Sequence, residues 1–167
     1  MAKGAFSKRK ELLTKGLSRT VKKKIVKAVV WSVALYGAET WALRKEDVRR
    51  LDAFEMWVWR KMEKISWTEH RTNEDVLKMV GEKRTLVDAI LRRKKNWIGH
   101  ILRGEGLMRE VIEGRMKGSR TVGRPRYGML DELYVDEKET YGGMKKRAQD
   151  RESWRCWLPW TCLRAEH

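Results

Sequence analysis

The sequence contains few residues that interrupt helices or cross-link a chain. Only two prolines occur in 167 residues, at positions 125 and 159, and no sustained alternation of β-branched with polar residues indicates a strand. Because proline breaks helices and alternation marks half-buried strands, we predict an almost wholly helical chain. The two cysteines, Cys156 and Cys162, stand near the C-terminus, where a disulfide bond would stabilise little. This cysteine usage predicts a reducing compartment.

Long hydrophobic runs are also missing. The longest uncharged stretch, residues 28–38, has eleven residues, whereas about 20 apolar residues are needed to cross a bilayer. No apolar segment of signal-peptide length follows the positive charges at the N-terminus. We therefore expect a protein that neither spans a membrane nor is secreted, located in the nucleus or the cytoplasm.

Motifs of enzyme chemistry are absent from the sequence. It has no glycine-rich phosphate loop and no GxSxG motif. Cys156, Cys162 and His167 lack the spacing of a zinc site. Residues 134–137 (YVDE) resemble a metal-binding string of polymerases, but a two-metal site needs further carboxylates on adjacent strands. The sequence thus predicts no catalytic residue, no metal site and no cofactor.

Positive charge is the feature that the sequence has in excess. Thirty-nine Lys and Arg face 23 Asp and Glu, which gives a net charge of +16 and an isoelectric point near 10.1. Such an imbalance indicates a polyanionic partner, and phosphate backbones of RNA or DNA are the obvious candidate.

Apolar spacing and capping residues place the elements along the chain. They predict helices over residues 18–36, 47–65, 73–80, 85–103, 107–116 and 143–154. The predicted fold class is all-α, with a helical bundle over 1–104, a basic glycine-rich linker with a short helix over 105–128, and a small helical C-terminal region over 129–167.

For two of these helices, the spacing of the residues indicates which side faces the core. In the helix over 18–36, about 100° per residue puts Ile25, Val29, Val33 and Tyr36 on one side, which we expect to be core. The opposite side faces solvent or phosphate and gathers Lys23, Lys24 and Lys27. In the helix over 85–103, Lys94 falls within the apolar arc, so either its stem snorkels or that turn is uncovered.

Candidate nucleic-acid-binding residues lie on two further helices and in the linker. On 47–65, Trp57 points away from the apolar stripe among cations, so its indole either stacks on a base or packs against a neighbouring helix. The cations around it are Arg50, Arg60, Lys61 and Lys64. The polar arc of 85–103 either contacts a phosphate backbone or is solvated, and it holds Arg92, Arg93, Asn96, His100 and Arg103. In the linker, Arg124 and Arg126 form either a flexible arm on phosphates or a tether.

Several segments together resemble a known family. They are residues 33–41 (VALYGAETW), 49–57 (RRLDAFEMW), 65–68 (ISWT), 71–74 (RTNE), 92–103 (RRKKNWIGHILR) and 123–126 (GRPR). In this order they resemble the region after the palm of non-LTR (LINE-type) retrotransposon reverse transcriptases. The resemblance extends from about Ala5 to the C-terminus, and its specificity comes from the order of the segments rather than from any one of them.

The resemblance implies a thumb-like helical bundle that grips a template-primer duplex. The family's catalytic aspartates belong to the palm, upstream of the segment that matches residues 35–41. We therefore expect a chain that binds RNA, DNA or their hybrid without polymerising, with a reverse transcriptase palm as a further partner in cis or in trans. Two alternatives stay open. One is a protein-interaction module that docks through Trp57, Trp154, Trp157 and Trp160, and the other is a degenerate remnant without function.

Overall fold

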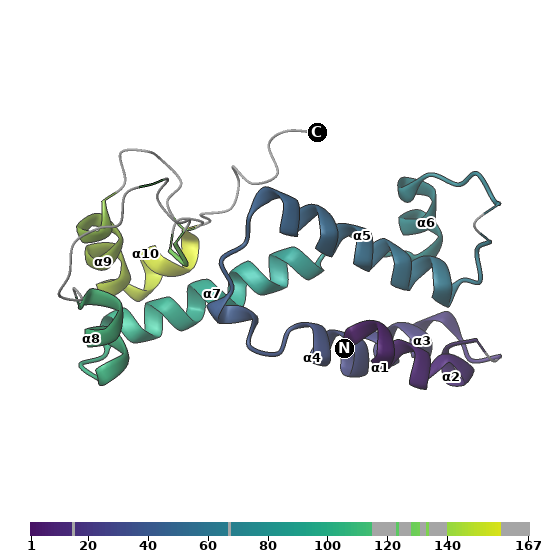
Figure 1. The fold of residues 1–167 in the computed structure, drawn as a ribbon, viewed down its shortest axis with the longest axis horizontal. Helices are drawn as coiled ribbons and strands as arrows, with labels where there is room; N and C mark the ends of the chain where they lie inside the picture. The colour runs from purple at the N-terminus through teal and green to yellow at the C-terminus, as the bar shows by residue number, and fades with distance from the viewer. Residues whose placement is uncertain are drawn as a thin grey trace. The chain divides into compact units, whose positions relative to one another are not determined.

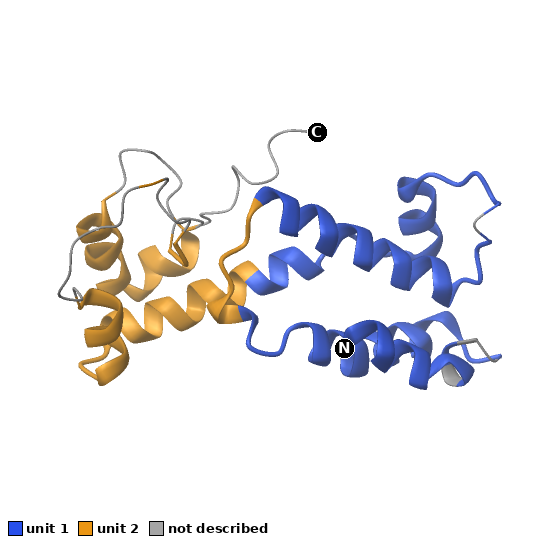
Figure 2. Ribbon diagram, in the orientation of Figure 1, with its two compact units in different colours: residues 1–38, 45–90 blue, residues 39–44, 91–167 orange. Residues whose placement is uncertain are grey.

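The structure is a computed structural model that describes residues 1–14, 16–66, 68–114, 123, 128–130, 133 and 140–157. Within these ranges the regular elements are helices and no strand occurs, which confirms the all-α class (Figure 1). The chain forms two compact units, coloured separately in Figure 2. Unit 1 comprises Met1–Ala38 and Lys45–Ile90, and unit 2 comprises Glu39–Arg44 and Leu91–His167. This partition falls elsewhere than the three predicted ranges, which stay predictions.

Unit 1 is built from N-terminal helices and two helices from the middle of the chain. Its elements are α1 (Ala2–Lys8), α2 (Lys10–Thr14), α3 (Arg19–Ile25), the π-helix η1 (Val26–Val30), α4 (Trp31–Ala34), α5 (Lys45–Met62) and α6 (Asn73–Val80). Helix α1 packs against η1 and α4, and α5 packs against α6. A short 3-10 helix, η2 (Ala38–Thr40), follows α4 along the chain.

Local capping residues bound two of the helices of unit 1. The hydroxyl of Ser18 accepts a hydrogen bond from the Val21 N–H at 3.4 Å and begins α3. Thr72 and Asp75 form a reciprocal capping box at the start of α6. Gly81, with φ at 64°, ends α6 in the left-handed conformation that glycine adopts without cost. These caps satisfy backbone groups that a helix end leaves unpaired.

The predicted core face of residues 18–36 is wrong. Val33 and Tyr36 are exposed, whereas Val26, Val30 and Trp31 are buried. The reason is η1, because a π-helix has more residues per turn than the α-helix assumed in the prediction. Past η1, side chains therefore point in different directions from those of an uninterrupted α-helix. The regular helix ends at Ala34 rather than at Tyr36.

Helix α5 carries a buried carboxylate that the apolar pattern concealed. Val48, Val58, Trp59 and Met62 are buried on this helix, and Glu55 is fully buried beside them. The Glu55 carboxylate accepts hydrogen bonds from the backbone N–H groups of Thr85 at 3.0 Å and Leu86 at 3.1 Å. These groups open α7 (Leu86–Arg103). Glu55 therefore caps that helix from a distant part of the chain, and the positive end of the helix dipole favours its charge.

Unit 2 contains most of α7, together with α8 (Leu107–Glu113), α9 (Tyr141–Gln149) and α10 (Arg151–Cys156). Its core is formed by apolar side chains from these helices and from the segments between α8 and α9. They are Ile98, Leu102, Leu133, Met144, Ala148 and Trp154.

The predicted helix over 143–154 is divided into α9 and α10, so the expectation of one helix is wrong. The residue between them, Asp150, has extended backbone angles, and its carboxylate accepts a hydrogen bond from the Glu152 N–H at 3.0 Å. Aspartate is a favoured N-cap because it pairs an otherwise orphaned N–H in this way. Asp150 thus ends one helix and begins the next.

Candidate nucleic-acid interface

Helix α7 carries in unit 2 a row of polar side chains that are exposed to solvent. Arg92, Asn96 and His100 are exposed and make no hydrogen bond or ion pair with any described part of the chain. They are spaced four residues apart, so they lie on one face with a rise of about 6 Å between neighbours. We call these three residues the α7 row. A guanidinium, an amide and an imidazole can all donate hydrogen bonds to phosphate oxygens.

The lysines between these residues point away from the row. Lys94 and Lys95 are both buried. The ammonium group of Lys94 donates to the Trp41 carbonyl oxygen, and that of Lys95 donates to the carbonyls of Arg155 at 3.0 Å and Trp157 at 2.6 Å. Burial lowers the pKa of Lys95, and the positive charge of Arg92 lowers it further. Lys94 neither snorkels nor lies in an uncovered turn, so both options that the sequence suggested are wrong.

Two other cations of the predicted polar arc are engaged inside unit 2. Arg93 lies 3.9 Å from a carboxylate oxygen of Glu39. Arg103 is half-buried and donates to the Ala148 carbonyl oxygen at 2.9 Å. Burial lowers the pKa of Arg103, and the nearby charge of Arg151 adds to this effect. Arg103 remains partly accessible to solvent, whereas Arg93 is paired with the Glu39 carboxylate.

Helix α10 lies along α7 and runs in the opposite direction. Arg103, at the end of α7, contacts the Ala148 carbonyl just before α10. Farther along α10, the indole N–H of Trp154 donates to the carbonyl of Lys95, about two turns earlier on α7, at 3.2 Å. The two helices approach closely at Gly99, where a Cβ atom would lie 2.7 Å from Cε2 of Trp154. The absence of a side chain at position 99 is therefore what allows this packing.

This packing adds two arginines that the sequence analysis missed. Arg151 and Arg155 are exposed and four residues apart on α10. For antiparallel helices joined through Trp154, about 100° per residue puts both on the side that adjoins the α7 row. The effect of Arg151 on the pKa of Arg103 agrees with this placement. The spacing RxxxR was visible in the sequence, but its orientation depends on the break at Asp150.

The lysines predicted on residues 18–36 are largely engaged within unit 1. Lys23 donates to the Val80 carbonyl oxygen at 3.0 Å, and both Lys23 and Lys27 pair with Glu82, at 3.3 and 2.9 Å. Lys23 thereby neutralises the negative end of helix α6. Lys24 is exposed and makes no such contact with the described residues.

Of the predicted cations on α5 and just after it, some contact other groups of unit 1 and others are exposed. Arg50 pairs with Glu46 at 2.7 Å. Arg60 donates to the Arg71 carbonyl oxygen at 2.7 Å and so holds the segment that leads to α6. Lys61 and Lys64 are exposed, without an ion pair to the described residues. The predicted group around Trp57 therefore retains only two uncommitted cations.

Trp57 packs inside unit 1, in agreement with the second of the two interpretations of this residue. Its ring lies 5.3 Å from that of Phe6 in an edge-on arrangement and 6.3 Å from that of Phe54 in a stacked one. The ammonium group of Lys3 stands 5.4 Å from the ring centre. A half-buried indole with an aromatic neighbour on two sides and a cation nearby has little free surface on which a base could stack.

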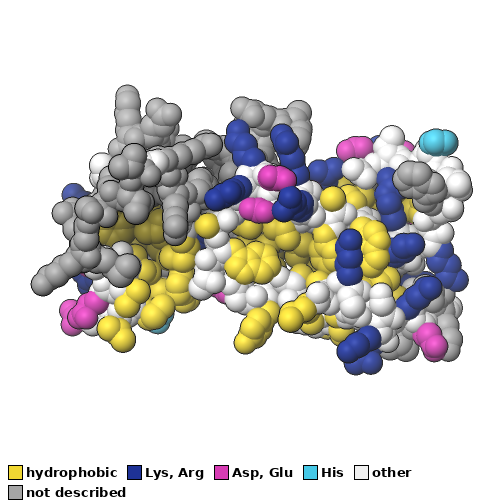
Figure 3. Space-filling model, in the orientation of Figure 1, with side chains coloured by type: hydrophobic (Ala, Val, Ile, Leu, Met, Phe, Trp, Pro, Cys, Tyr) yellow, Lys and Arg dark blue, Asp and Glu magenta, His cyan; other side chains and the backbone are white. Residues whose placement is uncertain are grey.

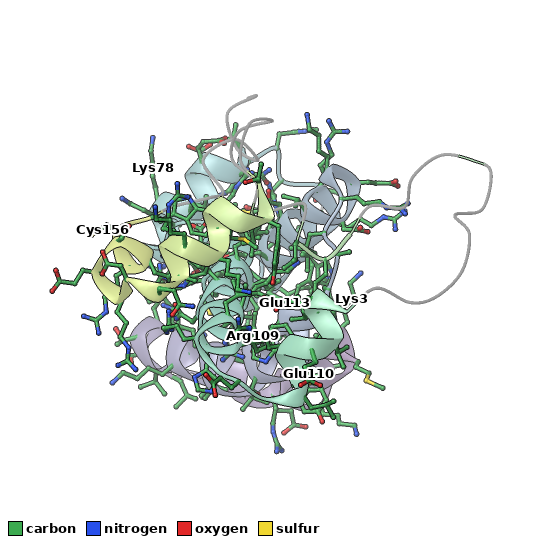
Figure 4. All side chains as sticks on the ribbon, turned by 90° about the vertical axis from the view of Figure 1, so that its left-hand side faces the viewer. Lys3, Lys78, Arg109, Glu110, Glu113 and Cys156 are labelled. Carbon is green, nitrogen blue, oxygen red and sulfur yellow. The ribbon has the colours of Figure 1, made fainter. Side chains whose placement is uncertain are left out.

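The carboxylate of Glu113 on α8 holds together side chains of α8 and α9. Glu113 lies 2.6 Å from the ammonium group of Lys145 and 3.3 Å from the guanidinium of Arg109, and it accepts a hydrogen bond from the Tyr141 hydroxyl at 3.1 Å. Figure 4 labels Arg109 and Glu113 on α8. The hydrogen bond from Lys145 is the main reason why the pKa of Glu113 is lowered. These cations serve the fold of unit 2.

The remaining candidate residues lie outside the described ranges, or the described side chains are not grouped as such a site would require. Arg124 and Arg126 lie outside the described residues, as does the acidic string at 134–137. In the part of the chain that the structure describes, no three His, Cys, Asp or Glu side chains are grouped as a metal site would require. None of the described helices has the length and hydropathy to span a bilayer.

Comparison with known proteins identifies no relative of this chain. No protein-family model matches the chain, and neither curated sequences nor solved structures give a match.

Proposed function

We propose that this chain binds the sugar-phosphate backbone of RNA, DNA or their hybrid, as the thumb-like C-terminal part of a LINE-type reverse transcriptase without the catalytic palm. The observation that carries the proposal is the α7 row beside Arg151 and Arg155. A row of exposed donors with no acid paired to it is stabilised when an anion neutralises it. The order of the family-like segments in the sequence supports the particular identity.

The contacts available are those of backbone recognition. Arginines at the α7 row and on α10 neutralise phosphates, and Asn96 and His100 donate hydrogen bonds. Trp57 is packed against Phe6, so its ring is not placed to stack on a base. The chain therefore binds with little sequence preference and does not itself extend a primer. Such a partner and the exposed thiol of Cys156 fit a nuclear or cytoplasmic location.

Fluorescence anisotropy with labelled 20-base-pair RNA/DNA hybrid, duplex DNA and single-stranded RNA tests the proposal. We expect Arg92→Ala to weaken binding to each of them, because one phosphate contact is lost whatever the sequence. The matched control is Lys78→Ala on α6, which removes the same charge from an exposed position labelled in Figure 4. Equal losses in the two variants would refute a localised interface, and primer extension by the chain with a divalent metal would refute the non-catalytic part.

The alternative of partner docking through tryptophans finds less support. Trp154 is buried against Gly99, and Trp157 is half-buried with the Arg147 guanidinium 5.0 Å from its ring centre. Trp160 lies outside the described residues. With Trp57 packed as well, the three described tryptophans of this group do not form an exposed aromatic surface.

A further inference from the structure

The segment formed by α3, η1 and α4 carries apolar side chains that are exposed among the described residues. Val21 is 41% exposed, Val33 38% and Tyr36 85%. Ile25 and Val29, between them along the chain, are half-buried. Residues three or four apart are neighbours on a helix surface, and these five side chains follow that spacing from α3 through η1 to just past α4. We call them the apolar row.

The π-helix η1 alters the direction of the end of the row. Val33 and Tyr36 follow η1 and are exposed, whereas Val21 and Ile25 precede it. The core is filled by Val26, Val30 and Trp31. The row is thus additional to the hydrophobic core rather than a part of it. On the face shown in Figure 3, hydrophobic side chains lie among Lys and Arg side chains over unit 1.

The charges on the segment that carries the row are all positive. Residues 19–34 contain five Lys and Arg and no Asp or Glu. Three of these cations are paired, Arg19 with Glu63 and both Lys23 and Lys27 with Glu82. Lys22 and Lys24 make no contact of this kind with the described residues, and they directly flank the Val21–Ile25 end of the row.

We propose that the apolar row is a docking surface for an amphipathic helix of another protein whose apolar face is bordered by Asp or Glu. Apolar residues at intervals of three or four form a ridge of the kind that packs into the groove of a second helix. Carboxylates on the partner pair with Lys22 and Lys24, which make no ion pair with the described residues. Apolar burial supplies most of the binding energy, and the two charges select an acidic partner.

Two other occupants fit less well. A second copy of this chain would bring its own Lys22 and Lys24 against the same lysines, because a two-fold interface pairs a surface with itself. An anionic membrane favours long apolar side chains that enter about 5–10 Å below the headgroups. Four of the five residues in the row are β-branched and at most 41% exposed, and only Tyr36 is exposed more than that, so the row suits a helix ridge better than insertion into lipid.

The test uses the full chain and two fluorescein-labelled helical peptides of about 20 residues. Both peptides present the same leucine face, and one borders it with Glu while the other borders it with Lys. We expect the Glu-bordered peptide to bind at least tenfold more tightly than the Lys-bordered one. The double variant Lys22→Glu with Lys24→Glu should reverse that preference. Equal binding of both peptides by the unmodified chain, or no change in preference, overturns the proposal.

A second set of variants locates the contact. Val33→Ser with Tyr36→Ser should weaken binding of the Glu-bordered peptide at least tenfold. The control, Leu107→Ser with Val111→Ser, alters side chains on α8 that are 72% and 65% exposed and should change binding less than twofold. Thermal unfolding followed by circular dichroism verifies that the variants fold. If Val33→Ser proves unstable, the preference reversal by the lysine variants decides the question alone.

Vesicles separate a membrane from a protein partner. Tight binding to phosphatidylserine vesicles that the Val33→Ser, Tyr36→Ser variant abolishes, together with no peptide binding, would contradict the proposal in favour of lipid. The proposal is independent of the nucleic-acid interface, which lies in unit 2, because Arg92→Ala should leave peptide binding unchanged.

Discussion

The α-carbon of Gly99 lies directly against the indole of Trp154, so that a Cβ atom at position 99 would come within 2.7 Å of Cε2 of the ring. Trp154 is buried, and its indole N–H donates to the Lys95 carbonyl oxygen. Gly99→Ala must displace the ring and lengthen or break this hydrogen bond. We expect a loss of about 1–3 kcal/mol in the free energy of unfolding, as is usual for overpacking, measured by urea unfolding followed by tryptophan fluorescence.

Gly142→Ala is the matched control for this prediction. Gly142 lies in α9, and a Cβ there would meet only the Thr140 hydroxyl at 3.9 Å. Alanine favours helix over glycine by up to about 1 kcal/mol, so this variant should be neutral or slightly more stable. Similar destabilisation by both substitutions would show that the Gly99–Trp154 contact is not special.

Glu55 makes the stability of unit 1 depend on pH in a defined direction. Burial raises its pKa, and hydrogen bonds from Thr85 and Leu86 offset only part of that effect. A carboxyl group with a higher pKa in the folded state than in the unfolded state binds its proton more readily when folded. Its contribution to stability is therefore complete below the unfolded pKa and is lost as pH rises through the folded one.

The variant Glu55→Gln isolates that contribution, since an amide does not titrate. The free energy of unfolding of the unmodified chain, relative to the variant, should increase as pH is lowered from 7 to 4. Urea unfolding of both proteins at each pH gives the difference. A difference that instead grew toward higher pH would mean that the backbone hydrogen bonds outweigh burial.

Lys23 and Lys24 are adjacent in sequence but differ in what they contact. Lys23 donates to the Val80 carbonyl and pairs with Glu82, whereas Lys24 is exposed. We expect Lys23→Met to lower the free energy of unfolding by about 1 kcal/mol, as for a partly exposed charged hydrogen bond. Lys24→Met should change it by less than about 0.5 kcal/mol. Thermal unfolding of the two variants compares them, and a larger effect at Lys24 would contradict the assignment.

Trp57→Ala distinguishes packing from base stacking. Because its ring contacts Phe6 and Phe54, truncation should cost about 1–3 kcal/mol of stability. Affinity for single-stranded RNA should change less than twofold under conditions where the variant is folded. Loss of a stacked base would instead weaken binding by about 1–3 kcal/mol with little effect on stability.

Features of the fold that depend on residues a few positions apart can be predicted from the sequence. Ser18, Thr72 and Gly81 cap helices through residues a few positions away, and capping of this kind follows from the local sequence. The π-helix could not be predicted from apolar spacing, because that spacing is interpreted on the assumption of a constant turn.

The candidate site shows the same limit. Lys23 was predicted to face phosphate or solvent, yet its partners lie 57 or more residues away on the chain, at Val80 and beyond. Likewise, Glu55 caps a helix that begins 31 residues later. Only the folded structure shows which cations such contacts engage and which, like Arg92, they leave exposed.

The salt dependence of duplex binding tests the proposed interface most directly. If Arg92, Arg103, Arg151 and Arg155 each neutralise one phosphate, the logarithm of the association constant for duplex DNA should fall against that of the salt concentration with a slope of about −3 to −4. Arg92→Ala should make this slope shallower by about 1, and Lys78→Ala should leave it unchanged. Binding that does not vary with salt, or an equal change in slope for the two variants, would contradict a phosphate interface on α7 and α10.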